Sequence, residues 1–117
     1  MERLKERTAR KQRLNGKILA SPMAVYFAFR AAGERVFADG ALSKKHKELM
    51  ALAVAVSQNC FDWIDHRVEE VLGKGATMEE IAETLDVGLL MGGTLCAKAV
   101  RHAFAVLEEL RGEGRPA

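Results

Sequence analysis

The stretch that decides the fold runs from Asp39 to Gly93 and reads DGALSKKHKELMALAVAVSQNCFDWIDHRVEEVLGKGATMEEIAETLDVGLLMGG. Within it, and almost everywhere else in the chain, apolar residues recur at the three- and four-residue intervals of an amphipathic helix. The two prolines, Pro22 and Pro116, fall outside every expected helix interior. The sequence therefore predicts an all-α protein, a compact bundle of about six helices.

Capping residues predict where two of these helices begin. Ser43 is a good N-cap for a helix that is apolar on most of its surface over residues 49–56, which is typical of a central, buried helix. Thr77, with Glu80 three residues later, has the pattern of a capping box. A further helix is expected directly after Thr77.

Asn59 resembles a third N-cap, because Asp62 follows it at capping-box spacing. Cys60 would then lie in the first turn of a helix that reaches Leu72. Free N–H groups and the positive end of the helix dipole favour a thiolate at such a position, and the thiolate is the reactive form of cysteine. The alternative is a small, unreactive core cysteine, and this helix alone does not decide between the two.

Three glycines, Gly88, Gly92 and Gly93, interrupt the apolar run GLLMGG at residues 88–93. Glycine in a helix interior costs about 1 kcal/mol relative to alanine. Their clustering therefore indicates either a break or a close approach of another helix. A last helix is expected over residues 94–110, where His102 should be hydrogen-bonded or exposed rather than catalytic.

The N-terminal end carries the positive charge. Residues 1–17 hold seven Lys or Arg against two Glu. The net charge of the whole chain is +2, so the net charge of residues 18–117 is −3. We expect a basic helix or arm that stops near Asn15 and Gly16, followed by a domain over residues 18–113. Because no aromatic residues interleave with these charges, a solvated helix on a neighbouring subunit is expected rather than a nucleic-acid-binding arm.

Ser21 and Pro22 predict the start of the next helix. Serine is a favoured N-cap, and proline is tolerated at the first helical position because its missing N–H would have no partner there. This helix should run to about Phe37, and the turn at Asp39 and Gly40 should end it.

The composition is that of a globular domain, with 117 residues, 49% of them apolar and 29% charged. The longest unbroken apolar stretch, residues 49–56, is far too short to span a bilayer. The N-terminus also lacks the apolar core of a secretory signal. We therefore expect a cytoplasmic protein that does not contact membranes.

Two parts of the sequence could carry chemistry: the helix that follows Cys60, and Glu48 on the helix before it. Trp63 and Arg67 lie near the helix face of Cys60, whereas His66 points about 120° away, so Arg67 is the better neighbour for a thiolate. Glu48 lies in a strongly apolar helix, where a carboxylate either faces a partner or serves chemistry. An exposed, salt-bridged glutamate is the simpler alternative.

The order of these pieces resembles the carboxymuconolactone decarboxylase and AhpD-like alkylhydroperoxidase superfamily over about residues 22–110. Its redox-active branch has a KEL-containing helix, a CxxCxxxH motif, a helix ending in GAT, an EEI-containing helix and an MGG segment. The matching positions here are KEL at 47–49, Cys60 twelve positions after Glu48, GAT at 75–77, EEI at 79–81 and MGG at 91–93.

Two departures from the family pattern affect the expected chemistry. Trp63 stands where the second motif cysteine belongs, so the disulfide between vicinal thiols cannot form. Arg67 stands where the motif histidine belongs, and His66 is one position early. Cys96 is the only other internal thiol, either as a resolving partner for Cys60 or as a buried apolar residue of the last helix.

The resemblance implies a thiol-dependent peroxidase, that is, an AhpD-like or peroxiredoxin-like antioxidant oxidoreductase. Cys60 would be the peroxidatic thiol, with Glu48, Arg67 and His66 as candidate catalytic groups and with Trp63 and Cys96 as pocket or secondary residues. One alternative is a decarboxylase-like enzyme acting on a small carboxylate or lactone, which Arg67 could bind. The other is a non-catalytic oligomeric scaffold or small-ligand binder.

The expected partners are few. The family implies a homo-oligomer (a dimer, trimer or hexamer), a small-molecule substrate and a thiol reductant. We expect no nucleic acid or membrane partner. Neither a phosphate-binding loop nor a His/Cys metal motif occurs in the sequence, so no cofactor and no metal are expected.

Overall fold

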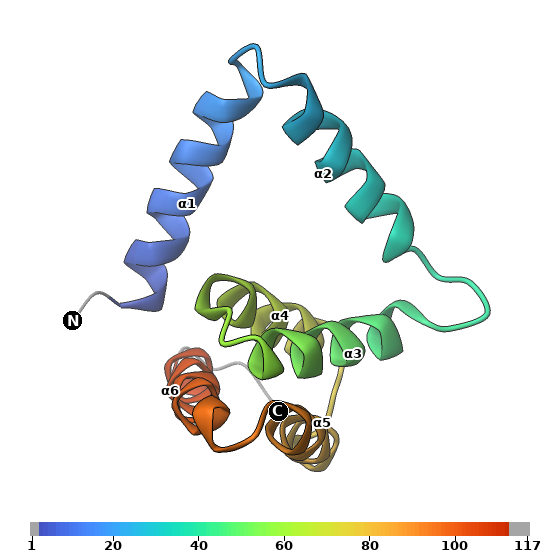
Figure 1. The fold of residues 1–117 in the computed structure, drawn as a ribbon, viewed down its shortest axis with the longest axis vertical. Helices are drawn as coiled ribbons and strands as arrows, with labels where there is room; N and C mark the ends of the chain where they lie inside the picture. The colour runs from blue at the N-terminus through green and yellow to red at the C-terminus, as the bar shows by residue number, and fades with distance from the viewer. Residues whose placement is uncertain (1–2, 113–117) are drawn as a thin grey trace. The chain divides into compact units, whose positions relative to one another are not determined.

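The computed structural model describes residues 3–112, and within them it contains six α-helices, one short 3-10 helix and no strand (Figure 1). The predicted all-α fold with about six helices is confirmed. Contacts divide the chain into two units, one up to Asp39 and one from Gly40 onward. The predicted domain boundary at residue 17 stays a prediction, and the predicted domain end at residue 113 lies outside the described residues.

The first unit is a helical hairpin of α1 (Leu4–Leu19) and α2 (Ala24–Val36), which diverge from the turn that joins them (Figure 1). The hydroxyl of Tyr26 donates to the side-chain oxygen of Asn15 and links the two helices. Among the described residues of this unit, only Leu4 is buried.

The predicted boundary between these helices was wrong at both ends. The first helix continues through Gly16 to Leu19, because a single glycine weakens a helix without ending it. The second begins at Ala24, with Met23 rather than Ser21 as its N-cap. The hydroxyl of Ser21 donates to the carbonyl of Ile18, so this serine closes the end of α1 instead of opening α2.

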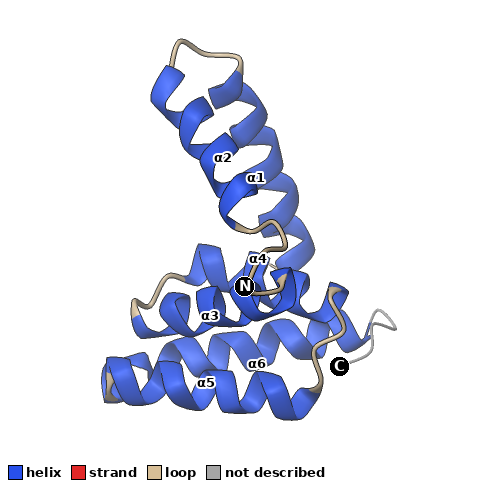
Figure 2. Cartoon of the chain, turned by 90° about the vertical axis from the view of Figure 1, so that its right-hand side faces the viewer, coloured by secondary structure: helices blue, strands red, loops and turns tan. Residues whose placement is uncertain are grey.

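The second unit is a four-helix bundle of α3 (Lys44–Ser57), α4 (Phe61–Gly73), α5 (Met78–Gly92) and α6 (Ala97–Gly112), with η1 (Thr94–Cys96) between the last two (Figure 2). Helix α3 packs against both α4 and α5, and α4 packs against α6. The core contains large, fully buried side chains from all four helices, among them Leu52, Val56, Ile64, Val68, Ile81 and Leu107. Within the described part of the chain, no helix is long and apolar enough to cross a membrane.

Two of the predicted caps are confirmed. The side chain of Ser43 accepts a hydrogen bond from the backbone N–H of His46 at 3.1 Å. The side chain of Thr77 accepts from the backbone of Glu80 at 3.1 Å, and the carboxylate of Glu80 accepts from the backbone of Thr77 at 2.8 Å. Both motifs act within one turn, which is why sequence spacing located them correctly.

The predicted cap at Asn59 was wrong. Asn59 has a φ of +53°, and α4 begins at Phe61 with Cys60 as its N-cap. The backbone N–H of Cys60 donates to the carbonyl of Ala55 at 2.9 Å, which is the hydrogen bond of a helix end that closes through a left-handed residue. Asn59 therefore terminates α3, and Cys60 lies one residue before the first turn of α4.

Gly88 and Gly92 mark a close approach of another helix rather than a break. Helix α5 runs unbroken through Gly88 and Gly92, and Gly93, with a φ of +79°, ends it. A Cβ atom on Gly88 would lie 2.8 Å from the carbonyl oxygen of Ala53, and one on Gly92 would lie 2.9 Å from that of Ser57. Both oxygens belong to α3, so these glycines let the two backbones touch.

Replacing Gly88 with alanine should destabilise the protein by about 1–3 kcal/mol, because the new methyl group meets a backbone oxygen that cannot move aside. Urea unfolding followed by circular dichroism measures the change. Gly73→Ala is the matched control, since nothing lies within 4 Å of its Cβ position. Equal stability of the two variants would contradict the close approach of α5 and α3.

Glu80 should make stability depend on pH. Hydrogen bonds from Lys45 and from the backbone of Thr77 hold the pKa of Glu80 below its ordinary value. Its contribution is therefore present above the unfolded-state pKa of about 4.3 and is lost as pH falls through the lower folded-state pKa. Glu80→Gln should thus reduce the unfolding free energy at pH 7 but not at pH 2, which urea unfolding at the two pH values measures.

Candidate functional site

The site is built on an ion pair between α3 and α4. The guanidinium of Arg67 donates from Nη1 to Oε1 of Glu48, and the two residues are 5% and 0% exposed. Lys44, one turn before Glu48 on α3, places its Nζ 3.3 Å from the second carboxylate oxygen. Glu48 is thus salt-bridged, as the simpler interpretation predicted, but it is fully buried rather than exposed. Two cations on one carboxylate leave this cluster with a net positive charge.

Trp63 covers the ion pair. The guanidinium carbon of Arg67 lies 4.6 Å from the centre of the indole ring, which is a cation–π contact, while the indole itself is partly exposed. His66 lies at the rim, with its ring edge-on to Trp63 at 6.4 Å between centres and its Nε2 4.0 Å from the carboxylate of Glu70. The structure therefore brings together three predicted site residues and leaves His66 at their edge.

Cys60 lies at the start of the same helix as a free, half-buried thiol. Arg67 follows it by two helical turns, about 10 Å along the helix axis, and Trp63 comes between them. Cys60 is the N-cap of α4, and the contacts that we describe for Arg67 are to Glu48 and Trp63 rather than to the thiol.

Cys96 is also a free thiol, but it is the last residue of η1 and is buried. Its sulfur donates to the carbonyl oxygen of Ser57 at 3.2 Å, and it occupies the space that the missing side chain of Gly92 leaves open. The sulfur therefore belongs to the close packing of α5 against the end of α3.

Sequence reasoning overlooked two sets of residues. Lys44 could have been found, because its spacing of four from Glu48 is the signal of an ion pair on a helix. Asp65 is buried on α4, and its carboxylate lies 2.8 Å from Nε2 of His102 on α6, whose ring stacks on Phe61 at 4.6 Å. This pair joins residues 37 positions apart, so no local pattern could reveal it. His102 is hydrogen-bonded, as expected.

An all-α bundle with a cysteine at the start of one helix and a buried glutamate on the helix before it defines a protein of the AhpD-like class. The model of the carboxymuconolactone decarboxylase family matches residues 24–109, which is most of the chain. The protein belongs to this family.

Solved structures agree with this assignment. The chain superposes on a crystal structure of TM1620 from Thermotoga maritima with a TM-score of 0.90 and 33% sequence identity, over 94% of this chain and 96% of that one. The chain also superposes on a second crystal structure of TM1620 with a TM-score of 0.85. That protein is a carboxymuconolactone decarboxylase family member for which a part in an antioxidative response has been suggested. A family member from Legionella pneumophila superposes with a TM-score of 0.84 and 29% identity, over 91% of this chain and 95% of that one.

Two uncharacterized relatives are similar in sequence. One, from the cox locus of Paracoccus denitrificans, is 40% identical over 85 residues, which is 73% of this chain and 77% of that protein. The other, from Cupriavidus necator, is 32% identical over 107 residues, which is 92% of this chain and 95% of that protein.

Removing the carboxylate of Glu48 should be strongly destabilising, because it leaves the Arg67 guanidinium buried without its charge partner. We expect Glu48→Gln to cost about 3–5 kcal/mol in urea unfolding. The double variant Glu48→Met, Arg67→Met should recover most of that loss, since it removes both charges together. Glu70→Gln, which alters the exposed pair with His66, is the control and should change stability by about 0.5 kcal/mol or less. An equal loss in Glu48→Gln and Glu70→Gln would show that the buried pair is not structural.

Proposed function

We propose that this protein reduces hydroperoxides through the thiol of Cys60 and uses a separate low-molecular-weight thiol as reductant. The position of Cys60 carries the proposal: it is a free, half-buried thiol at the N-cap of α4. The first-turn N–H groups of a helix have no partner within the helix, and together with its dipole they favour an anion. Membership of the family and the antioxidative role suggested for TM1620 support the same chemistry.

In the first step the Cys60 sulfur attacks one oxygen of the hydroperoxide. An S–O bond forms, the O–O bond breaks, and the alkoxide that leaves takes up a proton, while the thiol has lost its own. The products are a Cys60 sulfenic acid and an alcohol. The sulfur is oxidised and the peroxide is reduced, so this step needs no other reactant.

The second step needs another thiol, and Trp63 occupies the position of the family's second cysteine. Cys96 is buried and hydrogen-bonded to Ser57, so it could reach Cys60 only after the contact between η1 and α3 opens. We therefore assign resolution to an external thiol. It attacks the sulfenic sulfur and releases water to give a mixed disulfide, and a second thiol then exchanges with that disulfide and restores Cys60.

The buried charges have a positioning role in this scheme. Glu48 fixes the guanidinium of Arg67. The guanidinium in turn lies over the face of the Trp63 indole and holds the ring in place. Because Trp63 lies one helical turn after Cys60, a fixed indole gives the approach to the thiol an apolar wall. An alkyl hydroperoxide fits such a wall better than hydrogen peroxide does.

Peroxide oxidation followed by sulfenic-acid trapping and intact mass tests the proposal in wild type, Cys60→Ser and Cys96→Ser. We expect a sulfenic acid on Cys60 in wild type and Cys96→Ser, and none in Cys60→Ser. Oxidation should be about tenfold faster in the folded chain than in urea, equivalent to about 1.4 kcal/mol of transition-state stabilisation. An added low-molecular-weight thiol should regenerate Cys60.

Three results would contradict this proposal. A Cys60–Cys96 disulfide in the native protein would replace the external thiol with an internal one. Oxidation of Cys60 at the same rate in folded and unfolded chain would remove any role for the N-cap position. A Cys60 that peroxide does not oxidise would leave the cysteine-independent decarboxylase or the non-catalytic scaffold as the function.

A further inference from the structure

Helix α4 begins without the side-chain cap that starts its two neighbours along the chain. Ser43 caps α3 and Thr77 caps α5 through side-chain hydrogen bonds. The side chain of Cys60, the N-cap of α4, makes no such bond within residues 3–112. A helix end frays unless a cap or a tertiary contact holds it. The first turn of α4 therefore depends on what packs against it.

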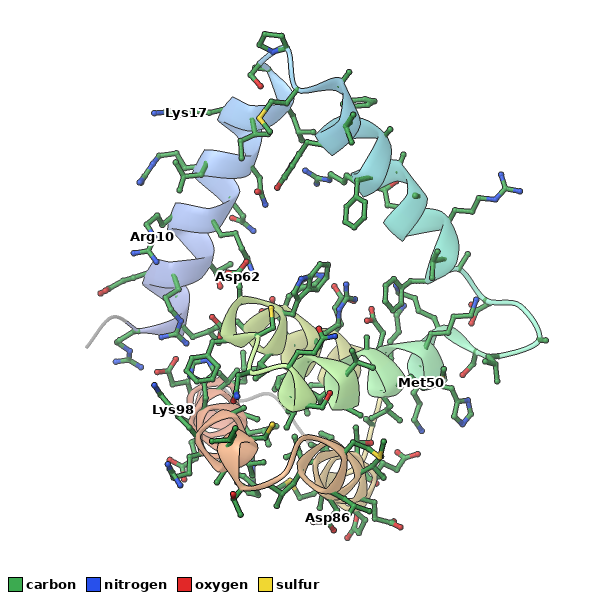
Figure 3. The ribbon with its side chains drawn as sticks, in the orientation of Figure 1. Arg10, Lys17, Met50, Asp62, Asp86 and Lys98 are labelled. Atoms are coloured by element: carbon green, nitrogen blue, oxygen red, sulfur yellow. The ribbon has the colours of Figure 1, made fainter. Side chains whose placement is uncertain are left out.

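Two pairs of side chains, one from each helix, join this turn to α6. Phe61 and Asp65 are four residues apart on α4, so they lie along one face of that helix, and the same spacing places Lys98 above His102 on α6. The imidazole of His102 stacks on the ring of Phe61, with 4.6 Å between centres and 8° between planes. The ammonium of Lys98, which projects from the start of α6 in Figure 3, lies 5.5 Å from the centre of the same ring. Phe61 is thus held by two residues of α6.

The position of His102 is itself fixed. Its Nε2 lies 2.8 Å from a carboxylate oxygen of Asp65, a residue that is 5% exposed. A carboxylate only accepts hydrogen bonds, so Nε2 carries the proton and donates it. Ala99 and Ala103, close to His102 on α6, are fully buried and anchor this helix in the core. The imidazole cannot turn away from Phe61 without breaking a hydrogen bond to a buried carboxylate, which is costly.

Phe61 follows Cys60 directly in the chain, so the contacts of its ring affect the backbone of the cysteine. On its N-terminal side, the N–H of Cys60 donates to the carbonyl of Ala55 at 2.9 Å, which joins it to the end of α3. On its C-terminal side, the carbonyl of Cys60 accepts from the N–H of Ile64 at 3.0 Å. This second bond exists only while the first turn of α4 is helical. The same condition directs the free N–H groups of the turn towards the N-cap, where they favour an anion.

We propose that His102 is a positioning residue for Cys60. By stacking on Phe61 and donating to Asp65, it keeps the first turn of α4 helical, and that turn keeps the N-cap geometry in which the Cys60 sulfur reacts. This inference rests on the proposed function, in which Cys60 is the peroxidatic thiol. The contacts of His102 with α4, rather than any contact with the peroxide, carry its role.

The rate at which Cys60 is modified in the folded full chain tests the proposal. Iodoacetamide and cumene hydroperoxide serve as separate reagents, peptide mass gives the rates, and circular dichroism confirms that each variant is folded. His102→Gln removes the ring but keeps a donor for Asp65. We expect it to slow both reactions about threefold, which is part of the roughly tenfold that we attribute to the folded chain. Arg101→Gln, at the neighbouring exposed position of α6, is the matched control and should react as wild type does.

The sign of the change separates positioning from simple stabilisation. If His102 only stabilised the fold, His102→Gln would loosen α4, expose the half-buried thiol and speed both reactions. Faster or unchanged reactions would therefore overturn the proposal. Phe61→Leu should slow the reactions to the same degree, and the double variant Phe61→Leu, His102→Gln should be no slower than either single variant, because both act through one contact. Effects that multiply in the double variant would also overturn it.

A rescue variant tests the stacked ring itself. Asp65→Asn, His102→Phe retains an aromatic ring on Phe61 and leaves no carboxylate without its histidine, so we expect it to restore the wild-type rates. Rates as slow as those of His102→Gln would contradict the role of the stack.

The two reagents separate this inference from the proposed function. Alkylation of Cys60 needs no peroxidase activity. Slower alkylation in His102→Gln, together with a wild-type Cys60 that peroxide does not oxidise, would support the positioning role and refute the proposed function. Peroxide oxidation of wild type that His102→Gln leaves unchanged would refute the positioning role alone.

Discussion

The ion pair between Glu48 and Arg67 is the interaction on which the arrangement of the site depends. Burying two charges costs several kcal/mol per ion, and their attraction repays this only when geometry and further hydrogen bonds satisfy both groups. Here Lys44 contacts the second carboxylate oxygen, and Trp63 lies against the guanidinium. Because the charges come from adjacent helices, the pair links α3 to α4. The position of α4, in turn, decides where Cys60 lies.

On its other side, α3 packs against α5 at two glycines, whose lack of a side chain allows the close contact. Gly88 and Gly92 bring the backbone of α5 against carbonyl oxygens of α3, and Cys96 fills the space beside Gly92. Helix α3 is thus held by the ion pair with α4 on one side and by backbone contact with α5 on the other. Leu90 and Met91, which lie between these two glycines on α5, are exposed.

The site differs from the family's CxxC motif at one of its two cysteines, where Trp63 stands. A vicinal thiol would resolve a sulfenic acid within one turn of the helix. Trp63 instead supplies a large aromatic surface, and Arg67 supplies a permanent charge that holds this surface in place. A thiol without a neighbouring thiol can still reduce a peroxide, but each turnover then ends with an external reductant. In the function that we propose, Trp63 would therefore leave the second step to an external thiol, while Cys60 keeps its place at the start of α4.

The sequence by itself determined the all-α fold, the caps at Ser43 and Thr77, and the family, because these depend on periodicity and on contacts within one turn. Only the tertiary structure decided that Glu48 is buried against Arg67, since the two lie 19 residues apart and no local pattern distinguishes a buried from a solvated glutamate. Asn59 was misread for a related reason. Asparagine is favoured both at a helix start and in the left-handed residue that ends one, and the choice depended on whether α3 could close its last turn onto Ala55.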